Sequence, residues 1–241
     1  VASDLRIAEQ YLQRIMAQSS SDIQAIAGSV SFAQVRENPA ALERYLDEQR
    51  QRLGLDFLYH LTNAQSKATA KRWPVIATAA AGGSQTSIDI FHAEDLKARS
   101  AALARQASLP LIATEAAVPT QRSTEDRGMV VHSATAIKTH RQSGVLVGGT
   151  LLNRNLNFID TINALVYRSK GSDRQGTATL FLEDVRISTN VRLFEDVRAL
   201  GTRVSAAVRS RVLDEGLTWL DRAFVVNDWY ISGYQPITDS F

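Results

Sequence analysis

The chain has no cysteine and only 2 methionines among its 241 residues. The absence of cysteine excludes disulfide bonds and thiolate chemistry, but it leaves the compartment open because many cytosolic proteins also lack cysteine. No run approaches the roughly 20 apolar residues that span a bilayer, so we expect no membrane-spanning helix within the chain. The formal net charge is +2 and no basic block is present, which argues against a nucleic-acid partner.

Patterns typical of enzymes and metal proteins are also absent. The 4 histidines are scattered, without the HExxH motif or the close ligand spacing of a zinc site. No GxSxG motif occurs, although a triad of distant residues stays possible. Gly148-Gly149 lies in an apolar run without the lysine of a phosphate-binding loop, so we attribute this pair to close strand packing. We therefore expect no catalytic residue, no metal and no cofactor.

A long amphipathic helix is predicted at the start of the chain, over residues 2–28. Its apolar positions follow steps of three and four, apart from a gap at Ser19, and are Leu5, Ala8, Leu12, Ile15, Ile23 and Ile26. At 1.5 Å per residue such a helix reaches about 40 Å, more than the core of a small module requires. One interpretation is a stalk that pairs with its copy in a parallel homodimer, and the other is a helix packed on its own domain.

The middle of the chain alternates helical and extended patterns. Pro39 suits the first turn of a helix and Gly54 its end. We predict helices over 39–53, 95–107 and 156–167, and strands over 55–61, 73–78, 109–117, 128–138 and 144–152. Two strands, a helix and three antiparallel strands are the order of a PAS-like α+β sensor module.

The last quarter of the chain predicts two β-hairpins. One has strands over 177–182 and 185–190 around Glu183-Asp184, and the other has strands over 222–226 and 229–234 around Asn227-Asp228. Asn and Asp tolerate the positive φ that a tight connection requires. This region is therefore predicted to be mostly antiparallel sheet.

The sequence strings of this region are similar to those of a known family. GTATLFLEDVRISTNV, RALGTRVS and AFVVNDWYISGYQPITD closely resemble the membrane-proximal module of extracytoplasmic double-Cache sensor domains, in which a type-3 Cache module precedes a type-2 module. Upstream, residues 128–130 and 148–155 resemble the closing strands of the membrane-distal module. The resemblance covers about residues 57–239. It implies an α+β fold in which a long N-terminal helix precedes two PAS-like antiparallel-sheet modules.

This resemblance also implies a domain order and a location. The expected regions are stalk and packing helices over 1–53, the distal module with its linking helix over 54–169, and the proximal module over 170–241, without its last strand. The polar connection at residues 170–176 is the candidate boundary between modules. The resemblance implies transmembrane helices before Val1 and after Phe241, and a periplasmic location at a bacterial inner membrane. The expected receptor is a sensor histidine kinase, and the alternatives are a chemotaxis receptor and a periplasmic binding module without signalling output.

Sensor modules of this kind bind a small molecule between the sheet and the elements that cross it. In the distal module the candidate ligand-binding residues are Arg72, Trp73, Arg99, Ser100, Thr114, His132 and Thr135. Arginine binds a carboxylate through two parallel hydrogen bonds, so an organic anion is the expected ligand, with Trp73 as a wall of the site. Amino-acid-binding relatives carry tyrosines around an arginine-tryptophan pair. Here Pro74 follows Trp73 and no tyrosine precedes Arg72 at the matching distance, which argues against an amino acid.

The proximal module contains further residues that match the family strings, namely Arg186, Thr189, Asn190, Arg203, Asp228, Trp229 and Tyr230. We expect mainly structural roles, because turn residues satisfy backbone geometry. Arg186 would then form an ion pair with a nearby carboxylate. The alternative is a second small-molecule site in this module.

Overall fold

The computed structural model describes residues 1–137, 144–167 and 176–241, and its contacts divide the chain into two compact units. Unit 1 comprises Val1–Leu12, Phe91–Met129 and Leu152–Thr238, and unit 2 comprises Gln13–Ile90, Val130–Leu151 and Asp239–Phe241. The domain bounds at residues 53 and 169 stay a prediction. Residues 170–175 of the candidate connection lie outside the described residues.

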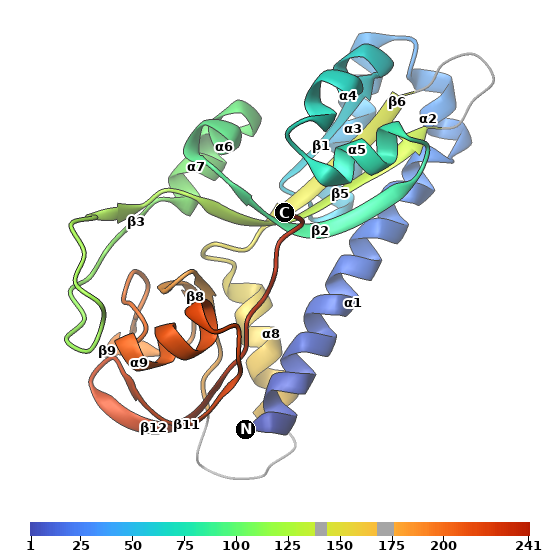
Figure 1. The fold of residues 1–241 in the computed structure, drawn as a ribbon. Coiled ribbons are helices and arrows are strands. Elements are labelled where there is room, and N and C mark those ends of the chain that lie inside the picture. Colours follow the sequence, from blue (N-terminus) through green and yellow to red (C-terminus); the bar gives the residue numbers. More distant parts are fainter. Residues whose placement is uncertain (138–143, 168–175) are drawn as a thin grey trace. The chain divides into compact units, whose positions relative to one another are not determined.

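Helix α1 (Ala2–Ala27) forms where the sequence predicts it (Figure 1). Its stripe is buried within the chain at Leu12, Ile23 and Ile26. The gap in that stripe, Ser19, is buried too, and its hydroxyl shares a 2.8 Å hydrogen bond with Ser133. The apolar stripe is therefore a packing face at these positions, as the second interpretation expects.

The centre of unit 2 is a four-stranded sheet in the order β1-β6-β5-β2. Its strands are β1 (Phe57–Thr62), β6 (Gly144–Leu151), β5 (Gly128–Ile137) and β2 (Ser84–Phe91). The β1–β6 and β6–β5 pairs are antiparallel. Successive side chains of a strand point to opposite faces, so each strand supplies both sides of the sheet.

One face of this sheet packs on α1 and on the helices α2 (Val30–Val35) and α3 (Pro39–Leu53). The core on this face consists of Ile23, Ile26, Phe32, Leu46, Leu55, Leu58, Ile137 and Leu146. A Cβ atom at Gly148 would lie 2.3 Å from Ile23 Cδ1, and one at Gly149 would lie 2.4 Å from Phe57 Cζ. The interpretation of the glycine pair as a close-packing feature is thus confirmed.

Two short helices lie against the strands of unit 2, α4 (Asn63–Ala70) on β1 and β6 and α5 (Pro74–Ala80) on β6. The prediction of a strand over 73–78 is wrong. Proline at the first helical position has its φ already set for a helix, and the alanines that follow favour one, so the apolar run continues as a helix. Trp73 is the residue before the first turn of α5.

In unit 1 the predicted helix over 95–107 is two helices, α6 (Ala93–Arg99) and α7 (Ala101–Ala107). Ser100 has an extended backbone between them, and its hydroxyl accepts a 3.1 Å hydrogen bond from the Ala102 N–H. Serine competes with the helix in this way, which explains the break. Of the predicted strand over 109–117, only β3 (Leu109–Pro110) forms, paired with β4 (Thr124–Glu125).

The C-terminal part of unit 1 begins with α8 (Leu156–Tyr167), as predicted. The first hairpin also forms as predicted, with Glu183 at φ 51° between β7 (Thr179–Leu182) and β8 (Val185–Thr189). The remaining elements are β9 (Arg192–Phe194), β10 (Val197–Arg198), α9 (Ala206–Arg209), the π-helical turn η2 (Ser210–Asp214), β11 (Trp219–Val225) and β12 (Asp228–Tyr234).

The turn of the second hairpin differs from the prediction by one residue. Asp228 is the first residue of β12, so the connection is Val226-Asn227, and Val226 takes the positive φ of 63°. The β11–β12 register, with Val225 opposite Asp228, sets this position. A β-branched residue in that conformation is uncommon, and the hairpin ladder holds it there.

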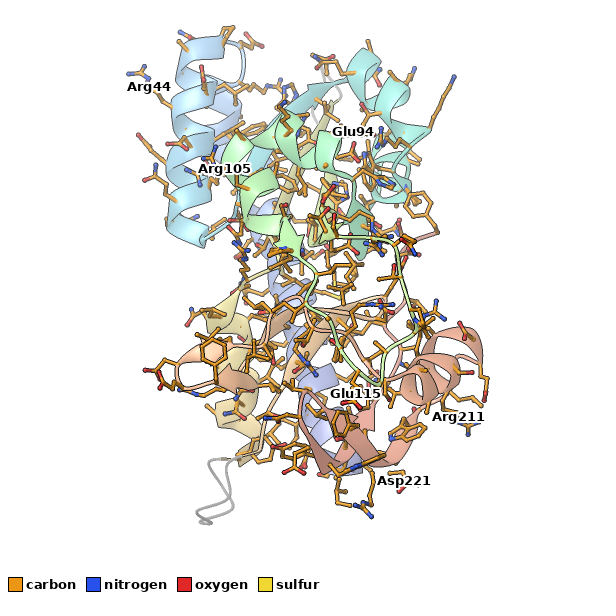
Figure 2. The ribbon with its side chains drawn as sticks, turned by 90° about the vertical axis from the view of Figure 1, so that its left-hand side faces the viewer. Arg44, Glu94, Arg105, Glu115, Arg211 and Asp221 are labelled. Carbon is orange, nitrogen blue, oxygen red and sulfur yellow. The ribbon has the colours of Figure 1, made fainter. Side chains whose placement is uncertain are left out.

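The α+β fold with a long N-terminal helix and antiparallel sheets is confirmed. Charged side chains such as Arg44 on α3 and Asp221 on β11 are exposed and project outward (Figure 2). Among the described helices, none combines the length and the apolar character that crossing a membrane would need.

Candidate functional site

A buried acid–imidazole pair lies at the sheet of unit 2. Asp89 on β2 and His132 on β5 are both fully buried, and Asp89 Oδ2 lies 2.8 Å from His132 Nδ1. The two side chains thus share one hydrogen bond, whose direction depends on the tautomer of the imidazole. Polar groups at this depth are costly unless they are hydrogen-bonded, and they give an otherwise apolar site its specificity.

Aromatic rings surround this pair. The Trp73 ring meets the His132 ring edge-on at a centroid distance of 5.2 Å, and the Phe57 ring meets it at 6.2 Å. The exposed Arg72 places its guanidinium 5.6 Å from the centre of the Trp73 ring. The structure therefore brings together three of the predicted residues, Arg72, Trp73 and His132, with Arg72 at the outer edge.

The last residues of the chain contact the same groups. The Ser240 hydroxyl donates a hydrogen bond to Asp89 Oδ1, and the Phe241 ring lies 6.2 Å from the Trp73 ring. The segment Asp239–Phe241, called the tail below, belongs to unit 2. The tail thus occupies both a buried acceptor and an aromatic surface of the site.

The other predicted residues do not join this group. Thr135 bonds to Ser84, and it shares its face of β5 with Ser133, which bonds to α1. His132 points to the opposite face because side chains alternate along a strand. Arg99, Ser100 and Thr114 belong to unit 1.

Two of those unit 1 residues have structural hydrogen bonds. Ser100 caps α7, and Thr114 Oγ1 accepts a 3.0 Å hydrogen bond from the Arg203 N–H. Asp89, Phe57 and the tail belong to the group around His132 but were not predicted from the sequence. A single carboxylate in the apolar run Ile88-Asp89-Ile90-Phe91 was a detectable pattern, whereas no local pattern marks the tail.

A second candidate is a polar cleft of about 530 Å³ in unit 1. Its lining includes His92, Glu94, Arg122, Glu125, Arg127 and Glu183, and Figure 2 labels Glu94. The buried Glu125 is the centre of an ion-pair network. Arg127 binds it through Nε and Nη2, both at 2.8 Å, and Arg122 Nη2 binds it at 2.5 Å.

The charges of this network neutralise one another. Burial raises the pKa of Glu125, but the hydrogen bonds from Arg127 and Arg122 outweigh burial and hold it below its ordinary value. Hydrogen bonds to Glu125 and Glu183 in turn raise the pKa of Arg127. Two arginines facing two glutamates have no excess charge for a ligand, so we assign this network to the stability of unit 1.

The family-matching residues of the C-terminal part divide into two groups. Arg203 Nη2 pairs with Asp184 at 2.6 Å, Thr189 and Asn190 hydrogen-bond within the β7–β8 hairpin, and Asp228, Trp229 and Tyr230 are exposed. Arg186 differs, because no carboxylate pairs with it among the residues that the structure describes. It is buried, and the side chain that it bonds to is Thr202, at 2.5 Å.

Comparison with known proteins gives a family match and structural similarity to solved proteins. Residues 150–241 match the model of the family described as single cache domain 3. A solved structure, the periplasmic domain of Vibrio cholerae LuxQ, is similar with 9% sequence identity, 82% coverage of each chain and a TM-score of 0.46. Comparison with curated proteins finds no match. The resemblance to Cache sensors is thus confirmed for residues 150–241, where the sequence strings are strongest.

Proposed function

We propose that the chain is the ligand-sensing region of a bacterial transmembrane receptor, and that the receptor is a sensor histidine kinase. Transmembrane helices on both sides of this region and a second, distal Cache module are part of the proposal. The match of residues 150–241 to a Cache sensor model supports it. The observation that carries it is the buried Asp89–His132 pair beside Trp73, which the tail contacts directly.

The groups of this site indicate the chemistry of the ligand. Asp89 accepts a hydrogen bond from the tail, and Trp73 packs on an apolar ring of the tail. A ligand in the same place would supply a donor group for Asp89 and an apolar body for Trp73. Arg72 at the edge would bind an anionic group. We therefore propose a small organic anion that also carries a hydroxyl or amino group.

A thermal-unfolding screen tests this proposal. The purified chain would be screened with organic acids, hydroxy acids, amines and zwitterions. A ligand present at 100 times its Kd stabilises the folded state by about 2.7 kcal/mol, which such a screen detects. Ligands that give a saturable rise in unfolding temperature would then be titrated by calorimetry.

Variants of the site residues test where in the chain the ligand binds. Removing one partner of a buried charge pair weakens binding by about 30-fold or more, and we expect this loss in Asp89→Asn. Because Arg72 is exposed, Arg72→Ala should lower the affinity by a smaller factor. Asp160→Asn, on α8 in unit 1, is the matched control and should bind as the parent does. Unchanged affinity in both Asp89→Asn and Arg72→Ala would remove the site from unit 2.

Receptor type and assembly are tested separately. The flanking gene sequence should encode two transmembrane helices and a cytoplasmic kinase. A methyl-accepting region in its place would identify a chemotaxis receptor, and a cleavable leader alone a binding module without output. We assign no reaction to the chain itself.

We also propose a parallel homodimer along α1, through the exposed face opposite its buried stripe.

A further inference from the structure

Unit 1 contains a buried arginine that pairs with no carboxylate in the described ranges of the chain. Arg186 on β8 is only 2% exposed. Its backbone is fixed on both sides, since its N–H donates to Thr202 O at 2.9 Å and its carbonyl accepts from Gly201 N at 3.0 Å. Its Nη1 donates to Thr202 Oγ1 at 2.5 Å. The guanidinium therefore has a fixed position inside the unit.

Other arginines of the same unit pair with carboxylates. Arg203 pairs with Asp184 at 2.6 Å, Arg198 with Asp160 at 2.8 Å, and Arg127 with both Glu125 and Glu183. In the described part of the chain no ion pair involves Arg186. Burial lowers the pKa of Arg186 to about 10, and the nearby Tyr234 opposes this shift. The side chain is therefore still cationic at neutral pH.

The neighbours of Arg186 compensate for its charge only in part. The guanidinium carbon lies 4.9 Å from the centre of the Phe181 ring, and the Phe181 and Tyr234 rings are 5.8 Å apart. A ring face attracts a cation, and Thr202 is a neutral acceptor. A desolvated charge requires more than these contacts, because burying an ion without a counter-ion is among the most costly features of a fold.

Two donors near Tyr234 also have no acceptor. Arg186 Nε and Trp219 Nε1 are buried and form no hydrogen bond within the residues that the structure describes. Trp219 lies directly opposite Tyr234 in the β11–β12 ladder, and both residues pack against the same core cluster. Buried N–H groups are almost always hydrogen-bonded, and an anion is the partner that satisfies donors and a cation together.

We propose that Arg186 and Trp219 bind a small anion beside Tyr234, either the carboxylate of an organic acid or an inorganic monovalent anion. This site lies within residues 150–241, the part that matches the Cache family model. It is separate from the Asp89–His132 site of unit 2. The proposal of an anion site does not depend on whether the Asp89–His132 site binds a ligand.

An NMR titration of the whole chain tests the proposal. Sodium methanesulfonate would be replaced at constant sodium concentration by chloride, acetate or succinate. The Arg186 Nε–H and Trp219 indole N–H resonances should shift in a saturable way. A shift with chloride alone identifies an inorganic anion, and a shift with acetate or succinate alone identifies a carboxylate. If neither resonance moves with any of these salts, the proposal is wrong.

Variants give a second measurement of the same site. Arg186→Met keeps the length of the side chain without its charge, and Trp219→Phe keeps a ring without its N–H. We expect the apparent anion affinity to fall by about 30-fold or more in Arg186→Met, measured from the anion-dependent unfolding temperature. Arg198→Met and Trp229→Phe are the matched controls and should respond as the parent does. Equal anion stabilisation in Arg186→Met and the parent overturns the proposal, and should Arg186→Met not fold, the titration of the parent decides.

Discussion

At Glu125 in unit 1, burial and ion pairing have opposite effects on the pKa of the side chain. Its carboxylate is buried, yet three guanidinium nitrogens bind it. Such a group stabilises the fold only while it is ionised and paired, because removing one partner leaves the other charges buried without compensation. The stability of unit 1 should therefore depend on the protonation of a single side chain.

The variant Glu125→Gln tests this dependence. The pKa of Glu125 is lowered from its ordinary value of 4.5 in the folded state, so its contribution is present above that value and is lost as the pH falls through the folded pKa. We expect the variant to lose about 1 to 3 kcal/mol of unfolding free energy at pH 7, with a smaller difference below pH 4. Urea unfolding across pH measures this, with the exposed Glu9→Gln as the control. A difference that stays constant with pH would contradict the argument.

Which arginine finds a carboxylate was not predictable from the sequence. Asp184 is two residues from Arg186 and 19 residues from Arg203, yet it pairs with Arg203. The β7–β8 turn and the bridge between Val185 and Arg203 bring the distant residue close. In unit 2, His132 and Trp73 were predictable from residue type. Asp89 stood out only as a single carboxylate in an apolar run, and its contact with His132 was not predictable because it depends on the pairing of β2 with β5.

At the scale of elements, the tail is a segment that contacts the groups of the candidate site. It uses Asp89 Oδ1 and the ring of Trp73, the groups that we propose for the ligand. A ligand must then displace the tail. The apparent affinity is therefore the intrinsic affinity multiplied by the fraction of molecules in which the tail is not bound.

Phe241→Ala should therefore strengthen ligand binding, provided that the proposed site is correct. Removing the ring weakens the tail contact on Trp73 without changing Asp89, His132 or Arg72. We expect the apparent Kd to fall by about 5-fold, which corresponds to about 1 kcal/mol of lost tail contact. Calorimetry with a ligand from the screen measures this. Ile237→Ala, at an exposed position outside the tail, is the control. An affinity that weakens in Phe241→Ala would make the tail a part of the binding surface.

Elements were predicted well where a periodic pattern was long and poorly where it was short. The helices α3 and α8 begin and end at the predicted residues. The short apolar run after Trp73 was taken for a strand, because periodicity over six residues does not separate a strand from a buried helix. The tail contact joins residues 151 positions apart in sequence, which no local pattern encodes.

At the scale of the whole molecule, α1 determines how two copies could pair. Its apolar stripe is buried within the chain at Leu12, Ile23 and Ile26, so those side chains are not available to a partner. The exposed positions at heptad spacing are polar or small, and are Gln10, Arg14, Ala17, Ser21 and Gln24. A dimer along this face would be weak in the isolated chain, since membrane anchoring raises the effective concentration.

The double variant Ala17→Glu, Ser21→Glu tests the proposed dimer. Both positions are exposed, so the fold should be retained, while four acidic side chains would meet across a parallel pair and repel one another. We expect the dimer fraction to fall by about 10-fold in sedimentation velocity at low salt. Ala40→Glu, an exposed position on α3, should associate as the parent does. Identical association of all three proteins would contradict pairing through this face.

The edge-on contact between Trp73 and His132 gives the chain an optical reporter of its own. The chain has 3 tryptophans, and Trp73 is buried in unit 2 whereas Trp219 and Trp229 belong to unit 1. With Trp219 and Trp229 replaced by phenylalanine, the emission of the remaining indole would come from a single ring that contacts His132 and Phe241. Its intensity would then follow the departure of the tail in real time and without any added dye.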